Sequence, residues 1–211
     1  MLWRDHSKEV PSGAHALLSA SKYSWLNDDE NDIFERYKRS FAATLGTVVH
    51  EFASKMIKNK IRLSKNDNHA ILLYLLDNNV PRFCIDMPTI IDNLRPFIND
   101  AIGFDMESEQ VLYYSEYCFG TCDAISFNDN LLRIHDLKTG TTQASFKQLE
   151  IYAALFCLEY KTKPNDICIE FRIYQNGEIN AMEADPNDIS EIMDKIVKFD
   201  KYIKHINQGE A

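Results

Sequence analysis

Residues 119–138 read FGTCDAISFNDNLLRIHDLK. Two runs rich in strand-forming residues flank a polar segment, and Asp and Asn tolerate the positive φ of a tight turn. If 129–130 is a two-residue loop, Asp123 and Asp136 face each other across the strands, with Cβ atoms about 5 Å apart. Lys138 lies two residues further on and therefore on the same side of the sheet as Asp136.

Two adjacent carboxylates repel each other unless positive charge lies between them. A divalent cation together with the lysine would supply that charge, and this interpretation is catalytic. The alternative is a surface Asp–Lys ion pair on an edge strand, which occurs by chance in many proteins. The hairpin alone leaves both open.

The composition is that of an ordinary soluble globular domain. The 211 residues, 45% hydrophobic and 26% charged, suit one domain or one domain with an insertion. No apolar run approaches the ~20 residues that span a bilayer, and the N-terminus lacks an apolar signal-peptide core. The five cysteines include no CxxC pair, so we expect reduced thiols in a cytoplasmic protein and no zinc site. The net charge of −9 argues against a general nucleic-acid coat protein.

Hydrophobic periodicity predicts helices and strands in the order helix, three antiparallel strands, helix, two strands and helix. The Asn-Gly pair at 176–177 indicates a second hairpin, and Pro186 suits the first position of a helix. We expect a short capped helix at 19–26, a loose acidic segment at 27–32, a helix from 33 to about 60, helices at 66–80 and 88–103, strands at 111–119, 121–127 and 131–138, a helix at 142–160, strands at 167–174 and 179–183, and a last helix from 186 to about 207.

One stretch is basic although the chain is acidic on average. Spacings of 3, 4 and 3 residues would place four cations on one helical face: Lys55, Lys58, Arg62 and Lys65. They can be solvated charges that complement the dipole at a helix C-terminus, or they can contact DNA phosphates. Both interpretations stay open.

Four short motifs occur in a fixed order along the chain. They are Gly46-x-x-x-His50, Gly120-x-x-Asp123, Asp136-x-Lys138 and Gln148-x-x-x-Tyr152, and the segments Leu18-Ser19-Ala20-Ser21 and Trp25-Leu26 precede them. In this order they resemble the motifs of RecB-like nucleases of the PD-(D/E)XK superfamily. The strings FGTCD and DLKTG are similar to those of phage-encoded RecB-like proteins without an assigned role. The resemblance covers about residues 17–56 and 110–160.

The resemblance implies an α/β fold with a restriction-endonuclease-like core, in which a mixed central sheet is flanked by helices. The core would bind Mg²⁺ or Mn²⁺, hard ions that prefer carboxylate oxygens. The implied metal ligands are His50, Asp123, Asp136 and the backbone carbonyl of Leu137, and the implied catalytic residues are Asp123, Asp136, Lys138, Gln148 and Tyr152. Tyr152 is equally suited to core packing. Glu116, on the strand before Gly120, would reach the metal only if Gly120 introduces a bulge. His135 and Glu150 are expected to face solvent.

The implied activity is hydrolysis of DNA phosphodiester bonds by an exonuclease in phage or bacterial recombination, replication or repair. Its site would lie in a single nuclease domain, 1–211, with 61–108 as a helical insertion or lid. The partner would be DNA, and no association with a membrane is expected. Assembly into a homo-oligomer and binding to a phage or host recombination protein are left open. Asn27 stands where the iron–sulfur branch of these nucleases has a cysteine, and no C-terminal cysteine cluster exists, so we expect no Fe–S cluster.

Three alternatives to that activity are retained. A nuclease fold without catalysis could bind DNA or protein, although such a module would not need clustered like charges. An additional specificity domain would favour a structure-selective or restriction-like endonuclease. A phage assembly or scaffold protein should show longer uninterrupted helices.

Overall fold

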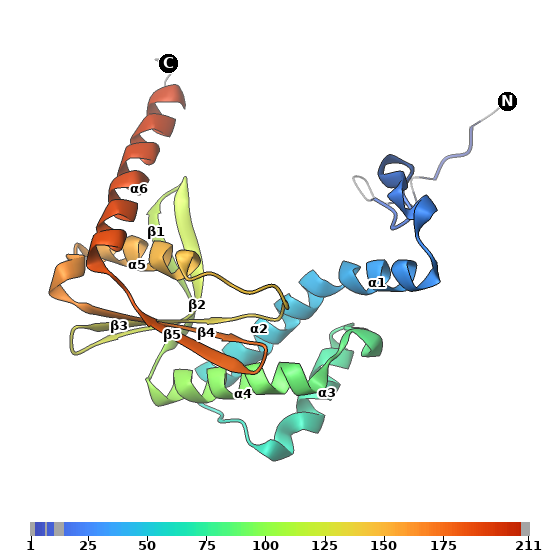
Figure 1. Cartoon of the computed structure of the whole chain (residues 1–211), viewed down its shortest axis with the longest axis horizontal. Helices are drawn as coiled ribbons and strands as arrows, with labels where there is room; N and C mark the ends of the chain where they lie inside the picture. Colours follow the sequence, from blue (N-terminus) through green and yellow to red (C-terminus); the bar gives the residue numbers. More distant parts are fainter. Residues whose placement is uncertain (1–2, 7, 11–14, 208–211) are drawn as a thin grey trace. The chain divides into compact units, whose positions relative to one another are not determined.

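The computed structural model describes residues 3–6, 8–10 and 15–207. The chain divides into two compact units, Met1–Ala43 and Thr44–Ala211, which are described separately. Figure 1 shows their elements coloured along the sequence. All the motifs from Gly46 onward lie in the second unit.

The first unit contains the 3-10 helix η1 (Ala20–Asn27) and the helix α1 (Glu30–Ser40). The short capped helix that the sequence predicts at 19–26 is present, and Ser19, one of two candidate caps with Ser21, is its cap because its hydroxyl accepts the Ser21 N–H. The loose acidic segment predicted to extend to residue 32 instead ends at Asp29. Asp29 and Asp32 form a reciprocal capping box, and acidic side chains stabilise a helix N-terminus.

The single helix predicted from residue 33 to 60 is also wrong, because α1 ends at Ser40 and α2 (Ala42–Lys58) begins as a separate helix. The N–H of Phe41 caps the last carbonyls of α1. At its other end α2 stops two residues early. Lys60 takes a left-handed conformation with φ 54°, and the N–H groups that follow α2 close its last turn.

A five-stranded mixed sheet organises the second unit, and its strands follow the chain order β1-β2-β3-β4-β5. All neighbouring strands are antiparallel except β3 and β4, which are parallel and joined through a helix. The strands are β1 (Glu107–Ser115), β2 (Cys118–Asn128), β3 (Leu131–Leu137), β4 (Cys168–Gln175) and β5 (Glu178–Glu183). The α/β prediction is therefore confirmed as a mixed sheet flanked by helices.

The β2–β3 hairpin has the predicted register. Asp129 and Asn130 both have positive φ, 52° and 59°, and Ala124 pairs with His135. One position further on, the Leu137 N–H donates to Asp123 Oδ2 at 2.8 Å. The hairpin thus ends with an aspartate side chain bonded to the neighbouring strand.

The β1–β2 hairpin differs from the prediction, which extended one strand through residues 111–119. The chain turns at Glu116 and Tyr117, although neither residue is a usual turn former. The Ser115 hydroxyl accepts the Tyr117 N–H, and the register shifts by one beside it. A local side-chain bond therefore replaces the glycine or asparagine that would have revealed the turn.

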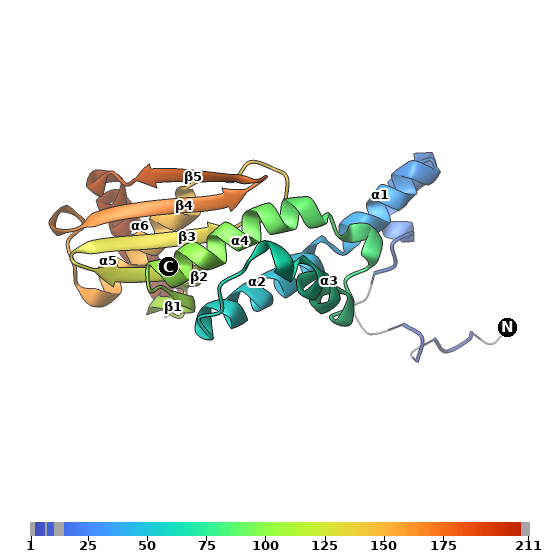
Figure 2. The same cartoon turned by 90° about the horizontal axis from the view of Figure 1, so that it is seen from below.

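Helices cover both faces of the sheet (Figures 1 and 2). On one face lies α5 (Lys147–Tyr160), with α6 (Pro186–Asn207) packed against it, and their apolar side chains form one core with Leu132, Ile134 and Phe171. On the other face lies α4 (Met87–Gly103), whose Phe97 packs on Tyr174. The predicted helix at 142–160 begins only at 147.

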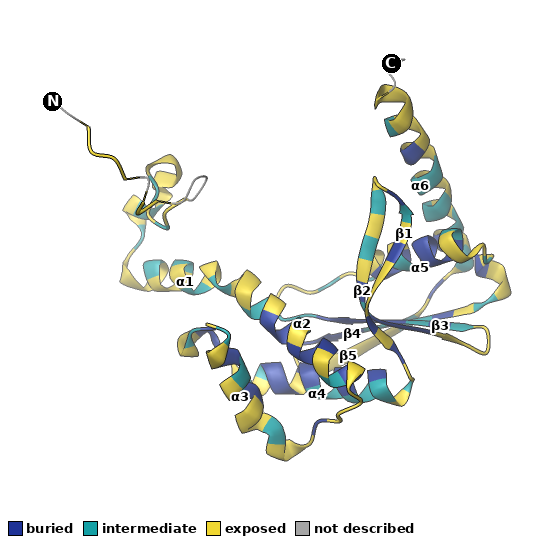
Figure 3. Ribbon diagram, turned by 180° about the vertical axis from the view of Figure 1, so that it is seen from behind, coloured by how far each residue is buried: buried dark blue, intermediate teal, exposed yellow. Residues whose placement is uncertain are grey.

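The remaining helical segments of this unit are η2 (Lys65–Asp67), α3 (Asn68–Asp77), η3 (Arg82–Cys84) and η4 (Pro164–Asp166). Helices α3 and α4 lie where the sequence predicts helices at 66–80 and 88–103. Phe52 of α2 packs edge-on against Tyr74 of α3. Figure 3 shows the buried residues on the facing sides of these helices and the sheet. Within the described part of the chain, no helix combines the length and the apolarity needed to cross a membrane.

Candidate active site

His50, Glu109 and Asp123 form a cluster whose ligand atoms all lie within 4.8 Å of one another. They come from α2, β1 and β2, and His50 Nδ1 lies 3.1 Å from Asp123 Oδ1. Neighbouring oxygen ligands of an octahedral Mg²⁺ are about 3 Å apart, because each bond is about 2.1 Å long. Small side-chain movements would therefore close this cluster around a divalent cation.

Glu109 is the member of the cluster that sequence reasoning missed. The register pairs Ser108 with Ala124 and Gln110 with Cys122, which places Glu109 opposite Asp123. Glu109 also has a φ of 54°, a left-handed conformation that a non-glycine residue adopts only where its surroundings impose it. The β1–β2 register could have identified Glu109 from the sequence, but predicting that register requires the turn after Ser115, which was not recognised.

The prediction that Glu116 could be a metal ligand is wrong, because the same hairpin places this residue in the β1–β2 turn. It lies exposed in the β1–β2 turn, and the extended strand from Cys118 to Asp123 separates this turn from Asp123. At about 3.3 Å per residue those five steps span about 17 Å, so the two carboxylates cannot bind one ion. Glu109 occupies the place for which Glu116 was the candidate.

Asp136 and Lys138 form a second group beside the cluster. Asp136 is 3% exposed, and Lys138 Nζ donates to its Oδ1 at 3.0 Å. The same amine also lies 3.0 Å from the buried Oδ2 of Asp136, which has no other hydrogen-bond partner among the described residues. Lys138 also donates to Gln148 Oε1 at 2.9 Å, and Gln148 Nε2 donates to Tyr152 Oη at 2.9 Å. The predicted Gln148–Tyr152 face of α5 thus positions the lysine.

The carboxylates crowd one another electrostatically. Burial and the charge of Asp123 raise the pKa of Asp136, and Lys138 opposes that rise. Burial and Asp123 likewise raise the pKa of Glu109. Burial alone would lower the pKa of His50, but its hydrogen bond to Asp123 and the surrounding acids outweigh this effect and raise it. A cation is the group that would relieve this crowding.

Two glycines of the motifs lie at contacts with other segments of the site. A Cβ on Gly120 would lie 2.8 Å from the Tyr152 ring, so β2 and α5 approach closely only because residue 120 has no side chain. A Cβ on Gly46 would lie 3.4 Å from Thr139 Oγ1, which follows Lys138. That distance is an ordinary contact, so only Gly120 is required for close packing at the site.

The loop between Lys138 and α5 is anchored by a buried glutamine. Gln175 Nε2 donates to the carbonyls of Gly140 and Thr142, and Gln175 Oε1 accepts the Ala144 N–H. Leu137 is the last residue of β3, and its carbonyl stays a predicted ligand.

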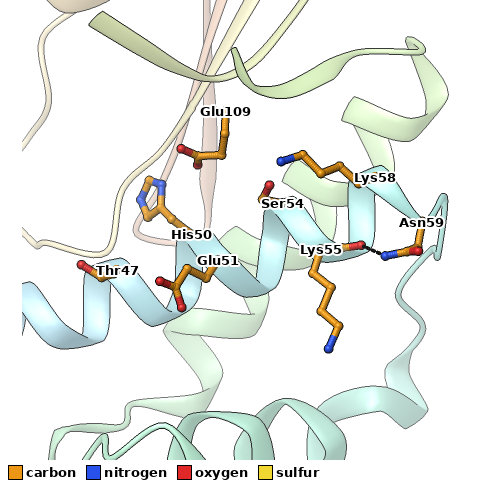
Figure 4. A pocket seen from close by; sticks show the side chains of 9 residues that line it. Thr47, His50, Glu51, Ser54, Lys55, Lys58, Asn59 and Glu109 are labelled. Atoms are coloured by element: carbon orange, nitrogen blue, oxygen red, sulfur yellow. Dashed lines mark hydrogen bonds between the residues drawn. The ribbon is translucent and has the colours of Figure 1, made fainter. Parts of the chain in front are cut away.

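The basic residues separate into two places. A groove of about 770 Å³ is lined by His50, Glu109, Lys55 and Lys58, among others. Figure 4 shows Lys58 extending toward Glu109, whereas Lys55 points to the other side of α2, where its amine lies over the Tyr74 ring.

Arg62 and Lys65 lie beyond the end of α2, and Lys55 and Lys58 extend in different directions from it, so the prediction of one basic helical face is wrong. Lys65 lines a different groove, between α3 and α4.

The two residues expected to face solvent are buried. His135 contacts Tyr174 on the α4 side of the sheet, and Glu150 pairs with Lys147.

Comparison with known proteins gives one family match. The family described as "Protein of unknown function (DUF2800)" matches residues 15–201, which include every residue of the site. A search of curated proteins found no match.

Proposed function

We propose that this chain, which belongs to the DUF2800 family of proteins of unknown function, is a divalent-metal-dependent deoxyribonuclease with a RecB-like PD-(D/E)XK site. One observation carries the proposal: the cluster of His50, Glu109 and Asp123 lies beside the buried Asp136–Lys138 pair. A metal cluster next to a lysine held by a carboxylate suits phosphodiester hydrolysis.

The residues present fit Mg²⁺ or Mn²⁺. Carboxylate oxygens suit both ions, and the imidazole of His50 favours Mn²⁺. The buried Oδ2 of Asp136 has only the Lys138 amine beside it among the described donors, so it keeps acceptor capacity for a cation. A bound cation would supply positive charge to the carboxylates and to the scissile phosphate.

The chain's own residues have distinct parts in this proposal. The Lys138 amine, held between Asp136 and Gln148, would orient the attacking water or offset negative charge that grows on the phosphate. Gln148 and Tyr152 act through Lys138 as positioning residues. Lys58, beside Glu109, would contact the DNA backbone. The resemblance to RecB-like nucleases supports action on DNA ends in phage or bacterial recombination, replication or repair.

The test compares wild type with Lys138→Ala on end-labelled linear DNA and closed circular DNA, in Mn²⁺, Mg²⁺ or EDTA. We expect hydrolysis that needs a metal and falls at least about 100-fold in Lys138→Ala. Lys198→Ala, which removes an exposed lysine from α6, is the matched control and should keep full activity. Loss of label from linear DNA alone indicates an exonuclease. Equal rates for wild type and Lys138→Ala, with both proteins folded, would refute the nuclease mechanism.

A further inference from the structure

The β1–β2 hairpin carries an exposed aromatic pair on its outer face. Tyr113 and Phe119 are directly paired across the strands, and their rings stack at a centroid distance of 6.2 Å with 26° between the planes. Tyr113 is 51% exposed and Phe119 61% exposed. The alternate residues Leu112 and Cys122 belong to the core under α5, so the aromatic face points away from it.

This face is continuous with the metal cluster. Glu109 and Asp123 are followed outward along the hairpin by the exposed pair Val111 and Thr121, and then by the two rings. Phe119 and Asp123 are four positions apart in β2, which corresponds to about 13 Å of strand. About four stacked nucleotides span that length at about 3.4 Å each.

We propose that Tyr113 and Phe119 form a stacking platform for the bases of an unpaired DNA strand that leads to the metal cluster, an inference that rests on the proposed nuclease function. Exposed ring faces bind bases by stacking, and the bases must be unpaired for their faces to be available. A duplex presents phosphates and groove edges to the protein instead. The platform would therefore select single-stranded DNA or the frayed end of a duplex.

The charges around the platform determine how it would hold a strand, because the hairpin carries acids (Glu107, Glu109, Glu116 and Asp123) that repel phosphates. No Lys or Arg occurs between residues 107 and 128, so the hairpin offers stacking and not phosphate neutralisation. The nearest cation of the groove is Lys58, which approaches Glu109 at the inner end of the same face (Figure 4). Binding at the rings should therefore depend little on salt, whereas binding at Lys58 should depend on it strongly.

A purely structural role is the competing explanation, since cross-strand aromatic pairs stabilise hairpins. Leucine separates the two roles, because it preserves apolar contact across the strands but has no ring face. The test therefore uses the double variant Tyr113→Leu/Phe119→Leu. Tyr113→Phe, which retains the ring, and Tyr202→Leu, which removes an exposed ring from α6, are the controls.

The assay is fluorescence anisotropy of a labelled oligothymidylate in EDTA, where no hydrolysis occurs, over a range of salt concentrations. We expect the double variant to bind about tenfold more weakly for each ring lost, with an unchanged slope of log affinity against log salt. Both controls should bind like wild type. Lys58→Ala should reduce the salt slope by about one. As an independent measurement, the added tryptophan fluorescence of Phe119→Trp should be quenched by the oligonucleotide.

The platform is refuted if wild type does not bind the oligonucleotide, or if the double variant binds it equally well. It is also refuted if the leucines abolish only self-association in sedimentation, because the rings would then contact a second copy of the chain. Failure of the nuclease proposal gives a different result. Ring-dependent binding would persist in EDTA, while Lys138→Ala would leave hydrolysis unchanged or wild type would show none.

Discussion

Replacing Gly120 by alanine should displace the lysine of the site without touching it. The added Cβ would lie 2.8 Å from Tyr152 Cε1, and ordinary contact begins at 3.4 Å, so the ring must retreat by at least 0.6 Å. The Gln148–Tyr152 hydrogen bond, now 2.9 Å, would lengthen to about 3.5 Å, where it is largely lost. Gln148 would then no longer be held against Lys138.

Overpacking of this kind costs about 1–3 kcal/mol of stability, and a misplacement of about 1 Å can lower a rate by 10²-fold. We therefore expect Gly120→Ala to lower the free energy of unfolding by that amount in urea titration and the rate of DNA hydrolysis by about 10–100-fold. The matched background is Tyr152→Leu, in which the clashing ring is absent. There the alanine should cost less than about 0.5 kcal/mol. An equal stability loss in both backgrounds would show that contact with the ring is not the cause.

Two further predictions concern buried or crowded charges. Glu109→Gln should weaken Mn²⁺ binding at least about tenfold in calorimetric titration, whereas Glu116→Gln should leave it unchanged; equal effects of the two would refute the assignment of Glu109. Burial and two neighbouring arginines lower the pKa of His135 to about 3 in the folded protein. In the unfolded chain this histidine has its usual pKa of about 6.5, so below that pH it takes up a proton there but not in the folded protein. The free energy of unfolding should therefore fall as the pH drops below about 6.5, by about 2 kcal/mol at pH 5. In urea titrations with EDTA, the free energy of unfolding of His135→Asn should vary less with pH than that of wild type. Parallel pH profiles for the two proteins would contradict this.

The predictable part of the site depends on local sequence. The Asp129–Asn130 turn sets the β2–β3 register by itself, because a two-residue loop with positive φ permits one pairing. Asp123 and Asp136 follow from that register. Asn176 and Gly177 act in the same way for β4 and β5. By contrast, His50 meets Asp123 across 73 residues, and only the motif resemblance predicted that contact.

The residues that the sequence misplaced depend on contacts that local pattern does not encode. Glu109 reaches Asp123 through a turn closed by the Ser115 hydroxyl, in a segment without glycine, proline or asparagine. Arg62 leaves the helical face of Lys58 because Lys60 takes a left-handed conformation that glycine would normally signal. In both cases an ordinary residue occupies a position whose backbone geometry usually identifies itself by residue type.

The distance between the metal cluster and the aromatic platform determines whether DNA binding at the platform requires a metal ion. Without a cation, the carboxylates of Glu109, Asp123 and Asp136 would repel a phosphate placed among them. The rings of Tyr113 and Phe119 lie about 13 Å along the hairpin, beyond the Debye length of about 8 Å at physiological salt. Stacking there is therefore largely screened from that repulsion. Capture of an unpaired strand and hydrolysis of its phosphodiester bond are thus separable steps, and only the second requires the cation.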